Sequence, residues 1–216
     1  MKRSLLLFSL SICFLGTCYG CREYDDNSVP SANTLIKSIS LSLDKASYSP
    51  GSTVTITSDR TLNGNYFVRY RQLGHVMADQ AISGKTWTWI APENDFTGYL
   101  AEVYRKDGTE ETVIGSIGID VSSDWAKFPR YGFLSDFGQL SQERITEVMT
   151  KLSRYHLNGL QYYDWHYDHQ KPLAGTALSP SASWLNISST VCYRSTINSY
   201  LKEAKARNMK SMFYNL

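Results

Sequence analysis

The hydrophobic pattern of this chain changes its period near residue 121, and no other feature constrains the fold as strongly. From about residue 36 to residue 121, apolar and polar residues alternate over short runs, which is the period of β-strands. From residue 122 to residue 216, apolar residues recur at helical spacing between short apolar runs. The chain must therefore fold as two differently built parts, a β-rich part followed by a mixed part.

The first part, residues 36–121, predicts six or seven short strands separated by turn signals such as Lys106-Asp107-Gly108. That density of short strands is typical of an immunoglobulin-like β-sandwich. Trp87 and Trp89 fall on one face of their strand, because strand side chains have a period of two. Large aromatic side chains usually serve burial, so we expect both rings in the core rather than on a sugar-stacking surface.

The second part is predicted to be strand, helix, strand, helix and strand. The strands are expected at residues 131–137, 160–165 and 211–216. Ser141 is expected to cap the first helix, and Asn158-Gly159 to end it. Cys192 is expected to be a small buried residue on a helix.

This order of elements implies parallel strands joined by helical crossovers. A doubly wound sheet and a (β/α)8 barrel both fit, but no Gly-rich phosphate loop follows the first strand, which argues against a dinucleotide-binding fold. We therefore predict that residues 122–216 form the first two and a half βα units of a (β/α)8 barrel, with the remaining units missing.

The most unusual stretch of the chain runs from Tyr162 to Pro172 and combines aromatic rings, carboxylates and imidazoles. In a βα barrel, functional residues lie at the carboxyl ends of the strands. Tryptophan offers a flat apolar face to a sugar ring, while carboxylate, imidazole and amide groups bind hydroxyls. The predicted substrate-binding residues are Asp136, Asp164, Trp165, His166 and Asn215.

Two chemical alternatives exist for these residues. Asp136 and Asp164 could be the carboxylate pair of a glycosidase, but orienting groups at the rim are more common than catalytic pairs, and we favour that role. His166 and His169 have the residue types of a metal site without a second ligand group of matching geometry. We expect no metal and no cofactor.

The N-terminus predicts export. Lys2 and Arg3 precede an apolar run at residues 4–15 that is too short for a membrane span. Cys21 follows a small residue and precedes an acidic run, which favours a lipoprotein signal over residues 1–21 with Cys21 as the lipidated residue. Cys18 and plain secretion remain alternatives. Residues 22–35 are polar and are predicted to be a tether.

Charge argues against nucleic acid as a partner. The chain has 22 Lys and Arg and 20 Asp and Glu, so removal of Lys2 and Arg3 leaves equal numbers of each sign. No basic patch interrupts this balance. Membrane association is expected through the lipid anchor only. With three of the four cysteines in the signal region, no disulfide framework is expected.

Three segments together resemble one known family. They are the junction at residues 120–134, the stretch 155–167 with its Tyr163-Asp164-Trp165-His166 run, and residues 209–216. They are similar to glycoside hydrolase family 66, which contains dextranases and cycloisomaltooligosaccharide glucanotransferases. The resemblance covers about residues 36–216, and the Tyr-Asp-Trp-His run is its most specific part.

The resemblance implies an immunoglobulin-like domain ahead of a catalytic barrel. It also implies a retaining attack on α-1,6-linked glucan by an aspartate nucleophile and a glutamate acid/base on later strands. No residue of this chain matches those two, so no catalytic residue is assigned and the chain alone is expected to be inactive. The expected partner is an α-glucan polysaccharide. The alternatives are a non-catalytic glycan-binding surface lipoprotein and a truncated, non-functional product.

Overall fold

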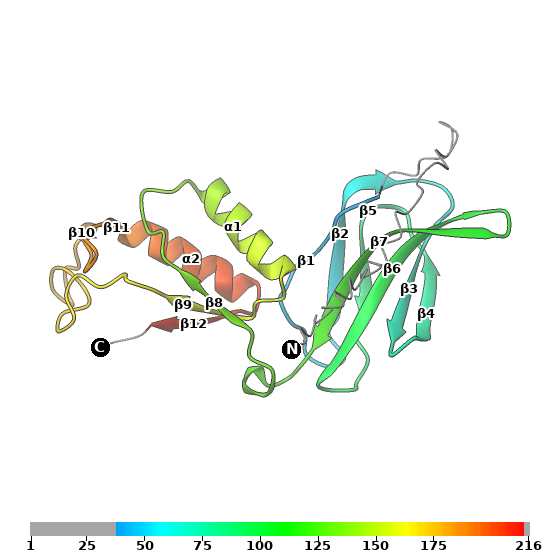
Figure 1. Cartoon of the computed structure of the whole chain (residues 1–216), viewed down its shortest axis with the longest axis horizontal. Helices are drawn as coiled ribbons and strands as arrows, with labels where there is room; N and C mark the ends of the chain where they lie inside the picture. Colours follow the sequence, from blue (N-terminus) through cyan, green and yellow to red (C-terminus); the bar gives the residue numbers. More distant parts are fainter. Residues whose placement is uncertain (1–37, 214–216) are drawn as a thin grey trace, which may run out of the picture. The chain divides into compact units, whose positions relative to one another are not determined.

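The structure, a computed structural model, describes residues 38–213, all of which belong to one compact unit (Figure 1). The predicted signal, the tether, Cys21 and Asn215 lie outside the described residues. Among the described residues, no helix has the length and apolar character needed to cross a membrane.

Two antiparallel sheets make up the first part of the described chain. The three-stranded sheet contains β1 (Leu41–Leu43), β2 (Thr53–Leu62) and β5 (Gly84–Ile90), in the order β1-β2-β5. The four-stranded sheet contains β3 (Tyr66–Gln72), β4 (His75–Ala81), β6 (Thr97–Asp107) and β7 (Glu110–Val121), in the order β4-β3-β6-β7. The sequence did not predict β4, which lies at a sheet edge and is mostly exposed, so it lacks the alternation that marks a half-buried strand.

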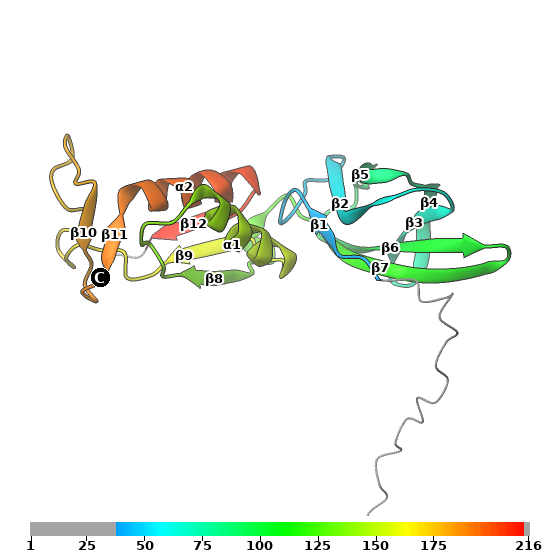
Figure 2. The ribbon, with the colours of Figure 1, turned by 90° about the horizontal axis from the view of Figure 1, so that it is seen from above.

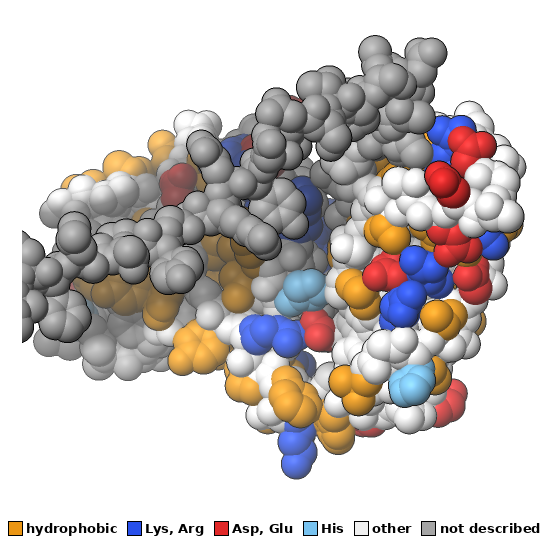
Figure 3. Space-filling view, turned by 45° about the vertical axis from the view of Figure 1, so that its right-hand side comes forward, with side chains coloured by type: hydrophobic (Ala, Val, Ile, Leu, Met, Phe, Trp, Pro, Cys, Tyr) orange, Lys and Arg blue, Asp and Glu red, His pale blue; other side chains and the backbone are white. Residues whose placement is uncertain are grey.

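Aromatic side chains join the two sheets. Trp89 on β5 stacks on Tyr70 on β3, with ring centroids 4.3 Å apart, and meets Tyr99 on β6 edge-on. Trp87 and Trp89 are both buried, which confirms the prediction that they belong to the core. On the opposite face of the four-stranded sheet, Arg69 and Glu102 form an ion pair at 2.8 Å. Figure 3 shows acidic and basic side chains mixed over the visible surface of this β-rich part.

The second part of the described chain contains a parallel sheet with helices on one face (Figures 1 and 2). Its elements follow in the order η1 (Trp125–Lys127), β8 (Tyr131–Leu134), α1 (Gln142–Arg154), β9 (Gly159–Tyr162), β10 (Ser183–Leu185), β11 (Val191–Tyr193), α2 (Arg194–Ala206) and β12 (Lys210–Phe213). The sheet order is β12-β9-β8, and both pairings are parallel, as predicted.

Helix α1 begins as the sequence predicts. The Ser141 hydroxyl accepts the backbone N–H of Arg144 at 3.2 Å, and Ile145 and Met149 are buried against the sheet. The helix ends differently. The residue in the left-handed conformation is His156, at φ 58°, rather than Asn158 or Gly159, so the turn comes two residues earlier than predicted.

The predicted fold class, an immunoglobulin-like sandwich followed by βα units of a (β/α)8 barrel, is wrong. The described residues are mostly β-sheet with only two α-helices, and no barrel of βα units is present among them. Strands β8, β9 and β12 form an open three-stranded sheet, whereas a closed barrel of this type needs about eight strands. The pairing of the two antiparallel sheets does not confirm an immunoglobulin type.

The segment just after β1 connects the two parts. The backbone N–H of Ala46 donates to the carbonyl of Arg207 at 2.9 Å, and Asn208 Nδ2 donates to the carbonyl of Ser47 at 3.2 Å. Tyr48 then pairs with the end of β7, where its N–H donates to the carbonyl of Asp120 at 2.9 Å. These bonds hold the end of α2 against the start of the β-rich part.

Candidate functional site

The carboxyl ends of the parallel strands hold four of the predicted site residues. Asp136 lies two residues after β8, and Asp164, Trp165 and His166 follow β9 closely. The fifth predicted residue, Asn215, comes after β12 and lies outside the described residues. Parallel strands bring their carboxyl ends to one edge of a sheet, so the segments carrying these residues share that edge.

Asp136 is exposed on a tight turn. Its Oδ1 accepts the backbone N–H of Gly138 at 3.1 Å, which holds the carboxylate beside its own turn. Burial raises the pKa of the Tyr200 hydroxyl, and the negative charge of Asp136 adds to that effect. Asp136 is therefore an exposed anion close to Tyr200 on α2.

Asp164 has a strained backbone that its neighbours hold in place. It lies in the left-handed region, at φ 52°. Its carbonyl accepts Asn186 Nδ2 at 2.6 Å, and its carboxylate Oδ2 accepts the Ser188 hydroxyl at 3.0 Å. Left-handed non-glycine residues cluster at functional sites, because surrounding structure must stabilise them. The 186–188 segment thus fixes the direction of the Asp164 carboxylate.

His166 and Trp165 differ in exposure. His166 is fully buried, and its carbonyl accepts the backbone N–H of Ile187 at 2.9 Å. Trp165 is partly exposed, and its ring contacts that of His166 with centroids 5.0 Å apart. His166 is therefore placed to support the Trp165 ring rather than to meet a ligand directly.

A groove at this edge was not predicted from the sequence. We call it the strand-end groove; it has a volume of about 530 Å³ and a mostly apolar lining. The residues that line it are Trp165, Pro172, Leu173, Trp184, Arg194, Ile197, Asn198 and Phe213. Trp165 meets Phe213 edge-on, with centroids 4.9 Å apart. Concave sites of this size with an aromatic lining and few polar groups are where small ligands bind.

Trp184 fixes the main chain that carries Trp165. Its Nε1 donates to the carbonyl of Trp165 at 2.8 Å, and its ring is buried. The Nε1 of Trp165 itself is buried and has no partner among residues 38–213. A buried donor without an acceptor is costly, and a ligand hydroxyl reaching it would remove that cost.

Trp184 lies between β9 and α2, outside the strands predicted from the sequence. This stretch contains the antiparallel pair β10–β11, in which Trp184 is opposite Cys192. Cys192 is buried, as predicted, but on β11 rather than on a helix, and burial raises the pKa of its thiol to about 11. The available signal in the sequence was Trp184 itself, followed by Leu185, in a stretch rich in serine.

Aromatic rings and carboxylates at the ends of parallel strands are residue types that suit carbohydrate binding. The family model described as "Glycosyl hydrolase family 66" matches residues 43–216 of the chain. The chain therefore belongs to glycosyl hydrolase family 66, which confirms the resemblance found in the sequence.

Two relatives are cycloisomaltooligosaccharide glucanotransferases from Niallia circulans. One is 36% identical over 131 residues, which cover 60% of this chain and 13% of the relative. The other is 29% identical over 195 residues, covering 79% of this chain and 19% of the relative. The chain thus spans less than a fifth of the length of these curated relatives.

A solved structure gives the same result at the level of the fold. It is a Paenibacillus sp. cycloisomaltooligosaccharide glucanotransferase complexed with cycloisomaltoheptaose. The similarity has a TM-score of 0.72 at 26% sequence identity, and covers 83% of this chain and 28% of that one.

Proposed function

We propose that this chain supplies part of the glucan-binding surface of an enzyme that acts on α-1,6-linked glucan. The observation that carries the proposal is the strand-end groove, in which Trp165 and Phe213 present aromatic rings and Arg194 and Asn198 add polar groups to the lining. A sugar ring offers apolar C–H faces and polar hydroxyl edges, and this arrangement has a partner for each. The curated relatives, named as glucanotransferases, support the substrate class.

Each predicted residue takes a specific role in this proposal. Trp165 is the stacking platform, and Asp164 accepts hydrogen bonds from sugar hydroxyls. Asp136 is a second, more exposed acceptor. His166 acts as a positioning residue beneath Trp165. Asn215, outside the described residues, would add an amide at the end of the third strand.

We propose further that the chain alone does not cleave glucan. The family implies a retaining mechanism with an aspartate nucleophile and a glutamate acid/base, roughly 5 Å apart. Asp136 and Asp164 each accept a local hydrogen bond, from Gly138 and from Ser188 respectively, which suits orienting groups. The pair is then supplied by polypeptide that this chain does not contain.

Affinity electrophoresis in gels containing dextran tests the binding proposal. Dextran in the gel should retard the purified chain. The Trp165→Ala variant should migrate equally far with and without dextran. Tyr155→Ala is the matched control, because Tyr155 is 79% exposed and lies outside the groove. Equal retardation of Trp165→Ala and the native chain would refute the role of the groove.

Incubation with dextran separates the enzymatic proposal from its rival. We expect no isomaltooligosaccharides from the chain alone, and their release would refute the proposal of inactivity. If the complete natural protein also binds dextran without cleaving it, the chain belongs to a non-catalytic glycan-binding surface lipoprotein instead.

We propose, from the sequence alone, that residues 1–21 direct export and that Cys21 carries a lipid. Metabolic labelling with a radioactive fatty acid should label the native chain and not Cys21→Ser. Equal labelling of Cys21→Ser and loss of labelling in Cys18→Ser would move the anchor to Cys18. No labelling of any form would leave plain secretion.

A further inference from the structure

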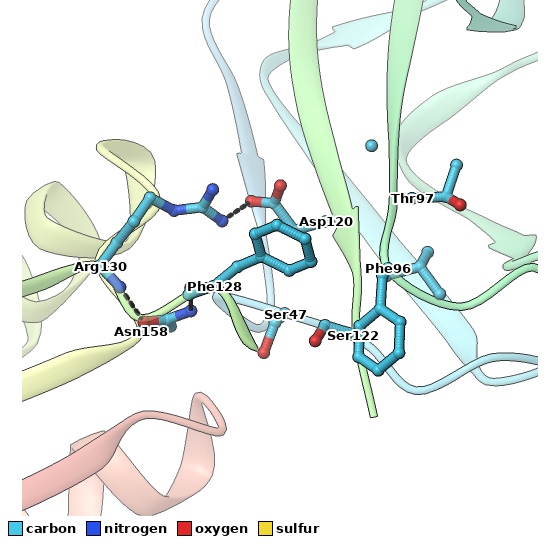
Figure 4. A pocket seen from close by; sticks show the side chains of 10 residues that line it. Ser47, Phe96, Thr97, Asp120, Ser122, Phe128, Arg130 and Asn158 are labelled. Carbon is cyan, nitrogen blue, oxygen red and sulfur yellow. Dashed lines mark hydrogen bonds and ion pairs between the residues drawn. The ribbon is translucent and has the colours of Figure 1, made fainter. Parts of the chain in front are cut away.

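A second pocket lies far along the chain from the strand-end groove, where β7 leads into β8. We call it the junction pocket; it has a volume of about 210 Å³. Figure 4 shows Phe96 and Phe128 next to each other, with Ser47 and Ser122 nearby and the bonded Asp120 and Arg130 on the side of Phe128 away from Phe96. Pockets that enclose drug-sized ligands measure roughly 300–1,000 Å³, so this volume suits a single sugar ring.

Phe96 is held on the surface by a strained backbone. Its side chain is 43% exposed, and its φ of 51° lies in the left-handed region, where a bulky residue is rare. Asp95 holds this conformation, since its Oδ1 accepts the N–H groups of Phe96 and of Ser123, both at 2.8 Å. The Ser123 hydroxyl donates to the same carboxylate. Backbone preference does not account for a phenylalanine here, and a residue kept in a strained conformation is often kept for a function.

Phe128 lines the same pocket and contacts Phe96. Its ring is 53% exposed and lies 6.0 Å from that of Phe96, tilted by 52°. Asn158 fixes its main chain, because Nδ2 donates to the Phe128 carbonyl at 3.0 Å. Phe96 and Phe128 thus form a preorganised aromatic pair. Asp95 anchors the backbone of the first, and Asn158 anchors that of the second.

An ion pair lies beside the Phe128 ring, on the side away from Phe96 (Figure 4). Arg130 Nη2 lies 2.5 Å from Asp120 Oδ2, which His156 Nδ1 also contacts at 2.9 Å. Oδ1 of Asp120 accepts from no residue in the described part of the chain, so it has lone pairs for an incoming hydroxyl. Arg130 and Asp120 together can thus bind two neighbouring hydroxyls of one sugar.

We propose that the junction pocket is a second carbohydrate-binding subsite, in which one glucose unit of an α-glucan packs against the exposed rings of the Phe96–Phe128 pair. The identity of the sugar rests on the proposed function. The aromatic pair and the Asp120–Arg130 ion pair are observed in this pocket itself. A long glucan chain held both here and at the strand-end groove would stay bound to the protein between encounters with the catalytic groups.

Indole signals in a ¹H–¹⁵N spectrum of the full chain can follow the two sites separately. Trp125 Nε1 donates to Asn158 Oδ1 at 2.8 Å and reports on the junction pocket, whereas Trp165 reports on the strand-end groove. Titration with isomaltohexaose should shift the Trp125 signal. Phe96→Ala and Phe128→Ala should each weaken the Kd read at Trp125 by about three- to tenfold, the worth of one aromatic contact.

Conservative variants separate a loss of binding from a loss of folding. Phe96→Tyr and Phe128→Tyr keep the ring and should keep the Kd read at Trp125, and all four variants should leave the Trp165 titration unchanged. If the alanine variants change thermal stability but not the Trp125 titration, the two rings only brace the junction and the proposal is overturned.

The two proposals fail in different ways. A Trp165 shift without a Trp125 shift overturns the junction subsite and leaves the groove. A Trp125 shift without a Trp165 shift supports the junction subsite and overturns the role of the groove. No shift of either signal overturns the glucan as ligand for both sites.

Discussion

His156 Nδ1 lies 2.9 Å from Asp120 Oδ2, which joins the end of α1 to the end of β7. The same oxygen contacts Arg130 at 2.5 Å, and Arg130 Nε donates to the His156 carbonyl at 2.9 Å. A Cβ placed on Gly118 would come within 3.2 Å of the His156 ring, so the imidazole fits closely over β7. His156 is therefore part of the contact between the β-rich part and the parallel sheet.

Replacing Asp120 by asparagine should destabilise this contact. The substitution keeps the shape of the side chain but removes the charge that Arg130 and His156 share. Hydrogen bonds to charged groups contribute about 1.5–3 kcal/mol, and we expect a loss of the free energy of unfolding in that range. Urea unfolding at pH 7 measures it, with the exposed Asp107→Asn as control. A change below about 0.5 kcal/mol, typical of surface substitutions, would contradict the role assigned to Asp120.

The contribution of Asp120 should depend on pH. Burial alone would raise the pKa of its carboxyl, but the bond from His156 and the charge of Arg130 bring that pKa below its ordinary value. The stabilisation is therefore complete above the pKa of an unfolded aspartate, about 4, and is lost as the pH falls through the lower folded value. The difference in unfolding free energy between the native chain and Asp120→Asn should shrink below about pH 4. A difference that grows on acidification would be inconsistent with this sign.

Asn158 is the hydrogen-bonding centre of the same junction. Its Oδ1 accepts Trp125 Nε1 at 2.8 Å and the N–H of Arg130 at 2.7 Å, while Nδ2 donates to the Phe128 carbonyl. Asn158→Ala leaves buried polar groups without partners, at about 1–3 kcal/mol for each group, so we expect a severe loss of stability. Thermal unfolding measures it, with the exposed Asn198→Ala as control. Equal melting of the two variants would show that water replaces the lost partners.

Local patterns in the sequence correctly predicted the elements whose residues contact others nearby in the chain. Ser141 and the spacing of Ile145 and Met149 define α1, and the alternation of Trp87 and Trp89 places both rings in the core. Both depend on periods of 3.6 or 2 residues, which are visible in a short window. The barrel was inferred from the order of elements alone, and that order does not determine how many strands a sheet contains or whether it closes.

The candidate site was only half visible in the sequence for the same physical reason. Asp164 and Trp165 stand out by type and by position after a strand. Their surroundings depend on contacts over about twenty residues, because Trp184 and Asn186 bond to their carbonyls. No periodic pattern records such contacts. The exposure of Phe96 likewise follows from its backbone conformation, which the sequence does not specify for phenylalanine.

The left-handed backbone of Asp164 leads to a separate prediction. Asparagine tolerates this conformation about as well as aspartate, whereas alanine there costs roughly 1–2 kcal/mol. Asp164→Asn should therefore unfold like the native chain in urea, and Asp164→Ala should lose about 1 kcal/mol. Both should bind dextran more weakly, because both lack the carboxylate. Full binding by Asp164→Asn would show that an amide oxygen is sufficient at this position. The negative charge would then have no part in binding glucan.

Trp184→Phe tests whether the β10–β11 pair positions Trp165. The substitution keeps an aromatic ring but removes the N–H that donates to the Trp165 carbonyl, so we expect a loss of about 1 kcal/mol in stability and severalfold weaker dextran binding. Trp89→Phe is the matched control, because Trp89 is buried between the antiparallel sheets and should change stability only. Retardation in dextran gels measures binding, and urea unfolding measures stability. Equal loss of binding in both variants would mean that global destabilisation, and not the position of Trp165, governs the groove.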